Sequence, residues 1–410
     1  MRRRDFLTAA GALGGLAITR IGTQAWAAQN PNAGPQRLVV VLLRGAVDGL
    51  NVVVPYNEHE YYAMRPSIAV PPPGHQGGGI DLDGQFAANP QLEPLMPLWK
   101  EKTLAFVHAC GSPDPSRSHF EAQGYMETGT PGVKTTTDGW LNRTLAVLPG
   151  QHPPTEAVNF GATMPRILHG SMAVASLPGA GGRAGGAAMD ANPLVHSAFD
   201  SMYSGADSLS VAYREGQSAH SRLMGDLERE MTAANGGAPS PAGFANDVAH
   251  FCTIARQDPT IQVGFFALGG WDTHTHEGNG GEGQLAKGLR QLAQGLAGFR
   301  KGLGDAGYEK TVVLVMSEFG RTARENGNAG TDHGHGNVMW VLGGAVRGGK
   351  VYGRWPGLSE PHLHDDRDLA VTTDFRTVAG SVLGQHMKLA SSAMAHVFPS
   401  APAASLPLMA

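Results

Sequence analysis

The stretch IQVGFFALGGWDTHTHEG, residues 261–278, joins a continuous apolar run to a loop that holds one carboxylate and two imidazoles within five positions. Continuous apolar runs of this length, rich in β-branched and aromatic residues, are typical of strands buried on both faces of a parallel sheet. Residues 261–268 are therefore predicted to form such a strand. Asp272, His274 and His276 follow directly at its carboxyl end.

Three further apolar runs have the same character, at residues 38–43, 103–109 and 311–316. Between the strands predicted at 261–268 and 311–316, apolar residues alternate at spacings of four and three, which indicates one buried face of a long helix. They are Leu285, Leu289, Leu292, Leu296, Phe299 and Leu303. Strand, helix and strand in this order predict an α/β fold, an α/β/α sandwich with a mostly parallel central sheet and functional loops at the carboxyl ends of the strands.

The chain of 410 residues is 41% hydrophobic and 16% charged, so it is long and apolar enough to bury a large core. Residues 28–410 are predicted to form a single domain. A Gly/Ala-rich insertion is expected at about 170–250, where the sequence loses its strand pattern, and PPPGHQGGG at residues 71–79 is expected to be a loop.

The first 27 residues are interpreted as an export signal and not as part of the fold. Arg3 and Arg4 precede Phe6-Leu7 and a short Gly/Ala-rich apolar stretch, and Ala25-Trp26-Ala27 provides a cleavage site. This order fits a twin-arginine signal, which predicts a periplasmic or secreted protein that meets the twin-arginine export machinery and keeps no stable membrane anchor.

Charge and cysteine content exclude several classes of protein. Removal of residues 1–27 takes away four arginines and one aspartate, so the net charge falls from −4 to −7. A nucleic-acid partner is therefore not expected. The two cysteines, Cys110 and Cys252, lack metal-binding spacing, and the sequence leaves open whether they pair.

A serine after the second predicted strand has two interpretations. Ser118 and Glu121 form an S-x-x-E capping box, in which the hydroxyl would cap a helix. Alternatively, a hydroxyl at a helix N-terminus is well placed to act as a nucleophile, with His119 beside it and Arg117 holding an anionic group. Asp48, before Gly49, is either a turn residue or a metal ligand.

Two histidine-containing loops predict a metal site. Asp272, His274 and His276 offer oxygen and imidazole ligands in one loop. The last predicted strand is followed by a second set of candidates, in which Asp332 could instead orient an imidazole. This set consists of Glu318, Arg321, Asp332, His333 and His335.

At these motifs the chain resembles the DUF1501 family of exported proteins and, through it, the alkaline phosphatase and sulfatase superfamily. The matching stretches are LLRGAVDGLNVVVPY, SRSHFEAQGYMETG, GGWDTHTH, VMSEFGRTARENG and TDHGHGNVMWVLGGAVRGGKVYGRWPGL. The resemblance implies a site of one or two metal ions built from Asp48, Ser118, Asp272 with His276, Glu318, and His333 or His335.

The sequence departs from that superfamily at two positions. Glu318-Phe319 replaces the usual Asp-His pair, so a second metal must recruit His333 or His335 or be absent. Pro113 occupies the position of the residue that sulfatases convert to formylglycine, which argues against a conventional sulfatase mechanism. Ser118, or less favourably Ser112 or Ser116, would then be the nucleophile.

The sequence therefore predicts an exported metal-dependent hydrolase of phosphate or sulfate esters, acting on an anionic small-molecule or polymer substrate. Arg117 or Arg321 would clamp the anionic group. The divalent metal could be Zn, Mn, Fe, Ca or Mg. The alternatives are a non-catalytic, metal-stabilised periplasmic binding protein and a metal-dependent isomerase or phosphomutase on the same fold, because fold alone does not decide the reaction.

Overall fold

The computed structural model describes residues 34–179, 210–211 and 229–410. The predicted export signal and most of the predicted insertion lie outside these residues. Residues Pro35–Ala410 cluster into one compact unit. Among the described residues, no helix is both long and apolar enough to cross a bilayer.

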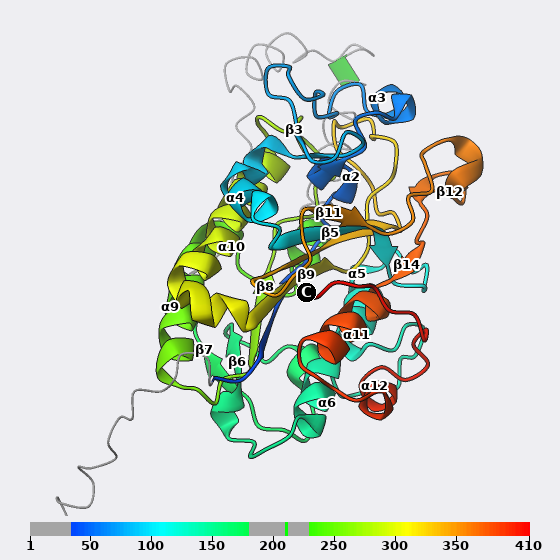
Figure 1. Cartoon of the computed structure of the whole chain (residues 1–410). Coiled ribbons are helices and arrows are strands. Elements are labelled where there is room, and N and C mark those ends of the chain that lie inside the picture. The colour runs from blue at the N-terminus through cyan, green and yellow to red at the C-terminus, as the bar shows by residue number, and fades with distance from the viewer. Residues whose placement is uncertain (1–33, 180–209, 212–228) are drawn as a thin grey trace, which may run out of the picture. The chain divides into compact units, whose positions relative to one another are not determined.

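A large mixed sheet forms the centre of this unit (Figure 1). Its strands lie in the order β11, β5, β10, β9, β1, β8, β6, β7, and β14 also pairs with β5. Their bounds are β11 Lys350–Tyr352, β5 Leu104–Gly111, β10 Asn337–Gly343, β9 Thr311–Ser317, β1 Arg37–Leu43, β8 Val263–Leu268, β6 Ala157–Phe160, β7 Ala175–Leu177 and β14 Thr373–Asp374. The four predicted strands are all present, as β1, β5, β8 and β9.

One strand within the sheet runs against its neighbours. β10 pairs antiparallel with both β5 and β9, whereas every other strand pair in the sheet is parallel. The sheet is therefore mostly parallel, as predicted. Because β10 is reversed, its amino-terminal end lies at the same edge as the carboxyl ends of β5 and β9.

Helices cover both faces of the sheet, as the alternating side chains of β1 show. Val39, Val41 and Leu43 belong to one core with α9 (Phe244–Gln257) and α10 (Gln284–Glu309). Leu38, Val40 and Leu42 belong to a second core with α6 (Trp140–Val147) and α11 (Phe375–Gln385). This is the predicted α/β/α arrangement.

The predicted long helix is confirmed as α10. Its six predicted core residues are all buried, and all face the same core as α9. The two cysteines lie on opposite faces of the sheet, Cys110 in the α11 core and Cys252 in the α9 core. Both are buried and free, and their positions on opposite faces of the sheet keep them from pairing.

Shorter elements surround the sheet. The helices are α2 Gly49–Val52, α3 His59–Met64, α4 Met96–Lys100, α5 His119–Thr128 and α12 Ser391–Val397. The 3-10 turns are η1 Pro90–Leu95, η2 Pro154–Glu156, η3 Arg166–Leu168, η4 Pro241–Gly243 and η5 Glu360–His362. The remaining strands are β2 Val53–Val54, β3 Ile80–Asp81, β4 Ala87–Ala88, β12 Leu363–His364 and β13 Asp368–Leu369. The predicted loop at 71–79 contains neither helix nor strand.

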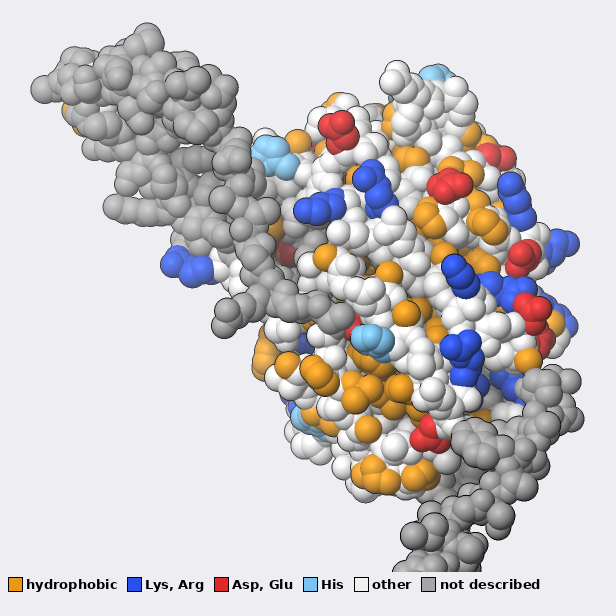
Figure 2. Space-filling model, turned by 90° about the vertical axis from the view of Figure 1, so that its left-hand side faces the viewer, with side chains coloured by type: hydrophobic (Ala, Val, Ile, Leu, Met, Phe, Trp, Pro, Cys, Tyr) orange, Lys and Arg blue, Asp and Glu red, His pale blue; other side chains and the backbone are white. Residues whose placement is uncertain are grey.

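The two ends of the region predicted as an insertion form parts of the α/β sandwich. β7 adds the outermost strand beside β6, and α9, which starts within the predicted range, packs against α10. On the face shown in Figure 2, acidic and basic side chains are interspersed among apolar ones.

Candidate metal centre

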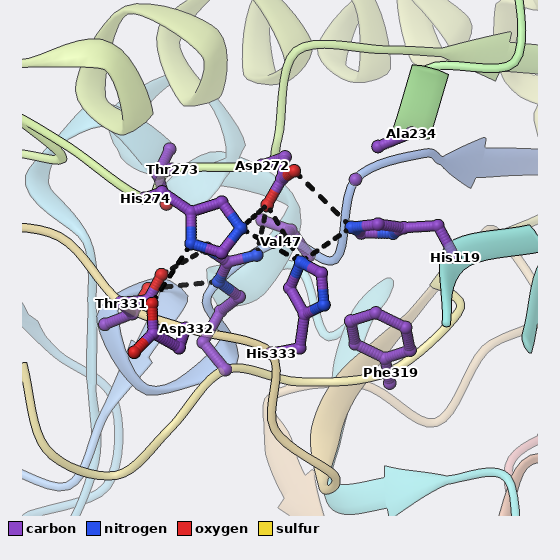
Figure 3. A network of polar contacts seen from close by, with 12 residues as sticks. Val47, His119, Ala234, Asp272, Thr273, His274, Phe319, Thr331, Asp332 and His333 are labelled. Carbon is purple, nitrogen blue, oxygen red and sulfur yellow. Dashed lines mark hydrogen bonds and ion pairs between the residues drawn. The ribbon is translucent and has the colours of Figure 1, made fainter. Parts of the chain in front are cut away.

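Four polar side chains meet at the edge where the carboxyl ends of β5, β8 and β9 lie. His119 is the first residue of α5, Asp272 and His274 follow β8, and His333 lies in the loop between β9 and β10. Figure 3 shows the three imidazoles and the carboxylate pointing toward one another. Asp272, His119 and His274 are buried, and His333 is partly exposed.

The Nε2 atoms of the three histidines converge. His333 Nε2 lies 3.0 Å from both His119 Nε2 and His274 Nε2. Asp272 places Oδ1 at 3.0 Å from His274 Nε2 and Oδ2 at 3.4 Å from His119 Nε2. His119, Asp272 and His333 form one group of candidate ligands, and His274 adjoins it through His333 and Asp272. Imidazole nitrogens combined with a carboxylate form the kind of donor set that Zn, Mn or Fe prefers.

The opposite nitrogen of each ring contacts an oxygen. His119 Nδ1 lies 2.7 Å from Glu318 Oε1, and His274 Nδ1 lies 3.1 Å from Asp332 Oδ1. His333 Nδ1 lies 2.9 Å from the carbonyl oxygen of Arg117. Carbonyls and ionised carboxylates accept but do not donate, so the Nδ1 atoms carry protons, and a ring that is neutral presents its Nε2 lone pair to the cluster. Metal-binding histidines are oriented in this way.

The cluster passes a test of fit for a cation. Converging Nε2 lone pairs repel one another unless protons or a metal ion lie between them. In the described part of the chain, Asp272 Oδ2 is buried and has no hydrogen-bond partner, although it faces the cluster. A divalent cation would satisfy both the orphaned oxygen and the three nitrogens.

The pKa shifts of His119, His274 and Asp272 in the metal-free cluster also favour a cation at this place. Burial would lower the pKa of His119, but the neighbouring carboxylates of Asp272 and Glu318 raise it to about 9. Burial would also lower the pKa of His274, but its contacts with the carboxylates of Asp272 and Asp332 raise it. Burial would raise the pKa of Asp272, but its three histidine neighbours hold it well below its usual range. The pocket therefore holds positive charge as protons, which a metal ion can replace.

Arg321 supports Asp272 from behind. Its Nη1 donates to Asp272 Oδ1 at 2.5 Å, and its Nε donates to Thr331 Oγ1 at 3.1 Å. The arginine side chain is fully buried. Arg321 therefore fixes Asp272 and is not available to clamp a substrate anion, which corrects one of the two predicted clamps.

Glu318 holds His119 and does not face the centre as a ligand. Its Oε1 also accepts from Gly45 N at 2.8 Å and from Gln123 Nε2 at 2.9 Å, and Oε2 accepts from Ser317 Oγ. Asp332, whose pKa falls to about 2 because of its hydrogen bond to His274, plays the same part for that ring. The structure thus places two predicted ligands behind His119 and His274.

A tight hairpin of the backbone places His333. Gly334 N donates to Gly320 O at 2.8 Å, and Gly320 N donates to His335 O at 2.9 Å. A Cβ on Gly320 would lie 1.8 Å from the carbonyl oxygen of Gly336, so only glycine allows this approach. The Gly-rich sequence around the histidines serves this close pairing.

Three predicted ligands lie outside the cluster. Asp48 is fully buried, caps α2 through Leu50 N and forms an ion pair with Arg65. His276 is exposed. His335 stacks on His364 with ring centroids 4.4 Å apart, and burial lowers its pKa to about 4. The structure places these three residues away from the candidate metal centre, each in a different environment.

The loop before α5 corrects two more interpretations. Ser118 is the N-cap residue of α5, but its side chain makes no capping hydrogen bond, and Glu121 instead bonds Ser116 and Lys134. The capping-box interpretation is therefore wrong, and the exposed Ser118 hydroxyl is free to act elsewhere.

The predicted second clamp, Arg117, is engaged in ion pairs. Its guanidinium pairs with Asp365 at 3.0 Å and with Asp368 at 2.6 Å. Asp368 is fully buried. The pairs hold the loop whose carbonyl binds His333, so Arg117 has a structural task. Ser112, also considered as a nucleophile, is buried with its Oγ accepting from Asp114 N at 3.2 Å.

Sequence reasoning does not identify several residues of the site. Asp368, Arg367 and Gln123 touch the loops that carry the histidines, and Arg367 Nη2 donates to His333 O at 2.7 Å. Glu230 places a carboxylate oxygen within 4.8 Å of ring nitrogens of His274 and His333. None of the four occurs in a recognisable ligand spacing, so the sequence contains no signal that would find them.

The fold and this cluster define an α/β protein with a candidate metal centre at the carboxyl edge of its sheet. The chain belongs to the family described as "Protein of unknown function (DUF1501)", which matches residues 93–398. No curated protein matches the sequence.

Solved structures with which the chain aligns include three at 9–10% identity. A protein in the alkaline phosphatase superfamily from Vibrio parahaemolyticus is 10% identical, with a TM-score of 0.40 over 78% of this chain and 63% of that one. The 2-O GAG sulfatase BT1596 is 9% identical, with a TM-score of 0.35 over 76% and 64%. The lipoteichoic acid synthase LtaP from Listeria monocytogenes is 10% identical, with a TM-score of 0.33 over 78% and 69%. The chain thus spans less than two thirds of the first two.

Proposed function

We propose that the protein is an exported hydrolase of phosphate or sulfate esters that depends on one divalent metal ion. The observation that carries the proposal is the convergence of His119, His274 and His333 Nε2 with the orphaned Oδ2 of Asp272. A divalent cation held there would act as a Lewis acid on an ester oxygen.

The donor set favours a single ion of Zn, Mn or Fe. Three imidazoles and one carboxylate suit these metals better than Ca or Mg, which take mainly oxygen ligands. A second ion would need further free ligands, but Glu318 and Asp332 are engaged with His119 and His274. One ion per chain is therefore the expected stoichiometry.

The chain's own residues give the centre its selectivity for anions. Three neutral histidines and one carboxylate leave a bound divalent cation with a net positive charge. Arg321 adds to this charge from behind Asp272. A positive field at the partly exposed His333 would attract an anionic ester group. The proposed substrate is an anionic ester, either of a small molecule or of a polymer.

The nucleophile in this proposal is the Ser118 hydroxyl or a water molecule. Ser118 is exposed, lies directly before the ligand His119, and makes no capping bond. A water nucleophile needs no protein hydroxyl at all. The two versions differ in the effect of removing the hydroxyl.

Export to the periplasm belongs to the same proposal. It rests on the sequence of residues 1–27, which lie outside the described residues. Twin-arginine export carries folded proteins, so the metal could be loaded before the chain leaves the cytoplasm.

Metal analysis combined with an ester screen tests the function. Elemental analysis of the purified protein should give about one ion per chain, and chromogenic phosphate monoesters, diesters and sulfate esters should reveal turnover. Asp272→Asn should lose metal and turnover together. A matched Asp365→Asn variant, which changes an exposed carboxylate, should keep both. Turnover that survives in Asp272→Asn would contradict the proposal.

One observation favours the non-catalytic alternative. Both arginines predicted to clamp the substrate anion are committed to carboxylates of the protein. A binding protein that uses the metal for stability needs no such clamp. Stoichiometric metal without turnover on any ester class would favour this alternative.

A further inference from the structure

Residues 229–234 are helical and lie next to the candidate metal centre. The carbonyl oxygen of Ala234 accepts from Gln123 Nε2 at 2.7 Å, and Asn235 Oδ1 accepts from Gly270 N at 2.6 Å. Gln123 also donates to Glu318, which holds His119. The end of this helical segment is therefore fastened to the same side chains that position the metal ligands.

Helix geometry then brings Glu230 to the centre. Ala234 is 2% exposed, and Figure 3 shows it beside His119 and Asp272, so this side of the helical segment faces the cluster. Glu230 lies four residues earlier, and residues four apart lie on the same helix face. Its carboxylate has an oxygen within 4.8 Å of ring nitrogens of His274 and His333.

We propose that Glu230 is an additional, exchangeable metal ligand that occupies the solvent-side coordination position until an anion displaces it. The inference rests on the proposed function. The carboxylate approaches His274 and His333, whereas Asp272 approaches from the buried side with His119. The four inner donors are fixed by hydrogen bonds and burial, but Glu230 is exposed, so it can move away without opening the core.

An exchangeable carboxylate explains how one centre can be both stable and open. Bound to the metal, Glu230 would add an oxygen donor beside His274 and His333 and would protect the ion from loss. A phosphate or sulfate oxygen would take this position when Glu230 leaves. The substitution would exchange one anionic oxygen donor for another.

Cobalt(II) and inorganic phosphate test this proposal with the purified full-length protein. We expect Glu230→Gln to weaken Co(II) affinity by about tenfold or more in competition with a chelator, as loss of supporting contacts at metal sites does. The visible absorption of bound Co(II) should become more intense, as expected when a protein ligand is lost and the coordination number falls. Inorganic phosphate should bind the Co(II)-loaded variant more tightly, because no protein ligand has to leave.

A matched variant and the wild type make the outcomes distinguishable. Glu93→Gln changes an exposed carboxylate on η1 and should leave Co(II) affinity, absorption and phosphate binding as in the wild type. If the wild type binds metal and cleaves esters but Glu230→Gln keeps the same Co(II) affinity and spectrum, the role of Glu230 is overturned and the proposed function stands. If the wild type binds no metal, both are overturned.

Discussion

Arg321 and Asp272 form a buried ion pair with Nη1 and Oδ1 2.5 Å apart, while the other carboxylate oxygen of Asp272 faces His119 in the candidate metal centre. Both side chains are at most 1% exposed. One carboxylate is thus shared between a fixed guanidinium and the site of a cation. Its negative charge remains compensated from one side whether or not metal is bound.

Removal of the guanidinium should destabilise the metal-free protein most. Arg321→Met leaves Asp272 as a buried charge with less compensation, and loss of one partner of a buried pair typically costs about 3–5 kcal/mol. A bound metal ion should reduce this cost because it also compensates Asp272. Urea unfolding with chelator and with saturating metal measures both values. Arg300→Met, at a more exposed pair with Glu101, should cost no more than about 1 kcal/mol. An equal cost with and without metal would contradict this account.

Asp368 should affect metal binding through Arg117 without touching the metal. It is fully buried and pairs with Arg117, whose carbonyl oxygen binds His333 Nδ1. Asp368→Asn weakens this support, so metal affinity should fall by about 10–100-fold. Asp365 pairs with the same guanidinium at an exposed position, and Asp365→Asn should change affinity little. Chelator competition measures both variants. Equal effects would show that Arg117 does not orient His333.

Ser118→Ala separates catalysis from helix capping. Because the hydroxyl makes no capping bond, the free energy of unfolding should change by less than about 0.5 kcal/mol. A true cap would cost about 1 kcal/mol. If Ser118 is the nucleophile, turnover is lost while metal stoichiometry stays the same. Turnover close to the wild-type rate would assign the attack to water.

Glu277 should make the protein less stable as the pH rises. Burial, together with the negative charge of Asp48, raises the pKa of Glu277 well above its usual range. The folded chain therefore binds a proton that the unfolded chain releases above pH ~4.3, and stability falls from there up to the folded-state pKa. The slope is at most about 1.4 kcal/mol per pH unit for one proton.

Glu277→Gln tests this dependence. The neutral amide removes the titration, and the hydroxyls of Thr273 and Thr331, which bond the carboxylate, can rotate to accept instead. The variant should therefore lose the negative slope and be more stable than the wild type at pH 8. Urea unfolding in chelator at several pH values between 5 and 8 measures it. An unchanged slope would mean that another group titrates.

Local pattern predicted the sheet where a strand is apolar along its whole length. β1, β5, β8 and β9 are buried on both faces, and α10 has a continuous apolar stripe, so each shows its character without knowledge of its partners. β10 was missed as an antiparallel member. Its residues are equally apolar, but strand direction depends on how the chain enters the sheet, which the strand's own sequence does not contain.

The residues of the candidate site could likewise be predicted only in part from local sequence. Motifs drew attention to Asp272, His274 and His333, because ligand residues are recognisable by type and by position after a strand. His119 was assigned to a different task, and Asp48, His276 and His335 were expected to be ligands. Residue type does not say which ring nitrogen faces which neighbour, and that decides whether a histidine binds metal.

The sequence by itself determined the layered α/β architecture, the edge of the sheet that carries function, and the residue types of a metal centre, because apolar periodicity and strand-end position are local properties. Only the tertiary structure decided which side chains form the centre. His119 and Asp272 are 153 positions apart in the sequence, and Glu318 and Arg321 turned out to hold ligands in place. These roles depend on distances of about 3 Å between segments that meet only when the sheet is assembled.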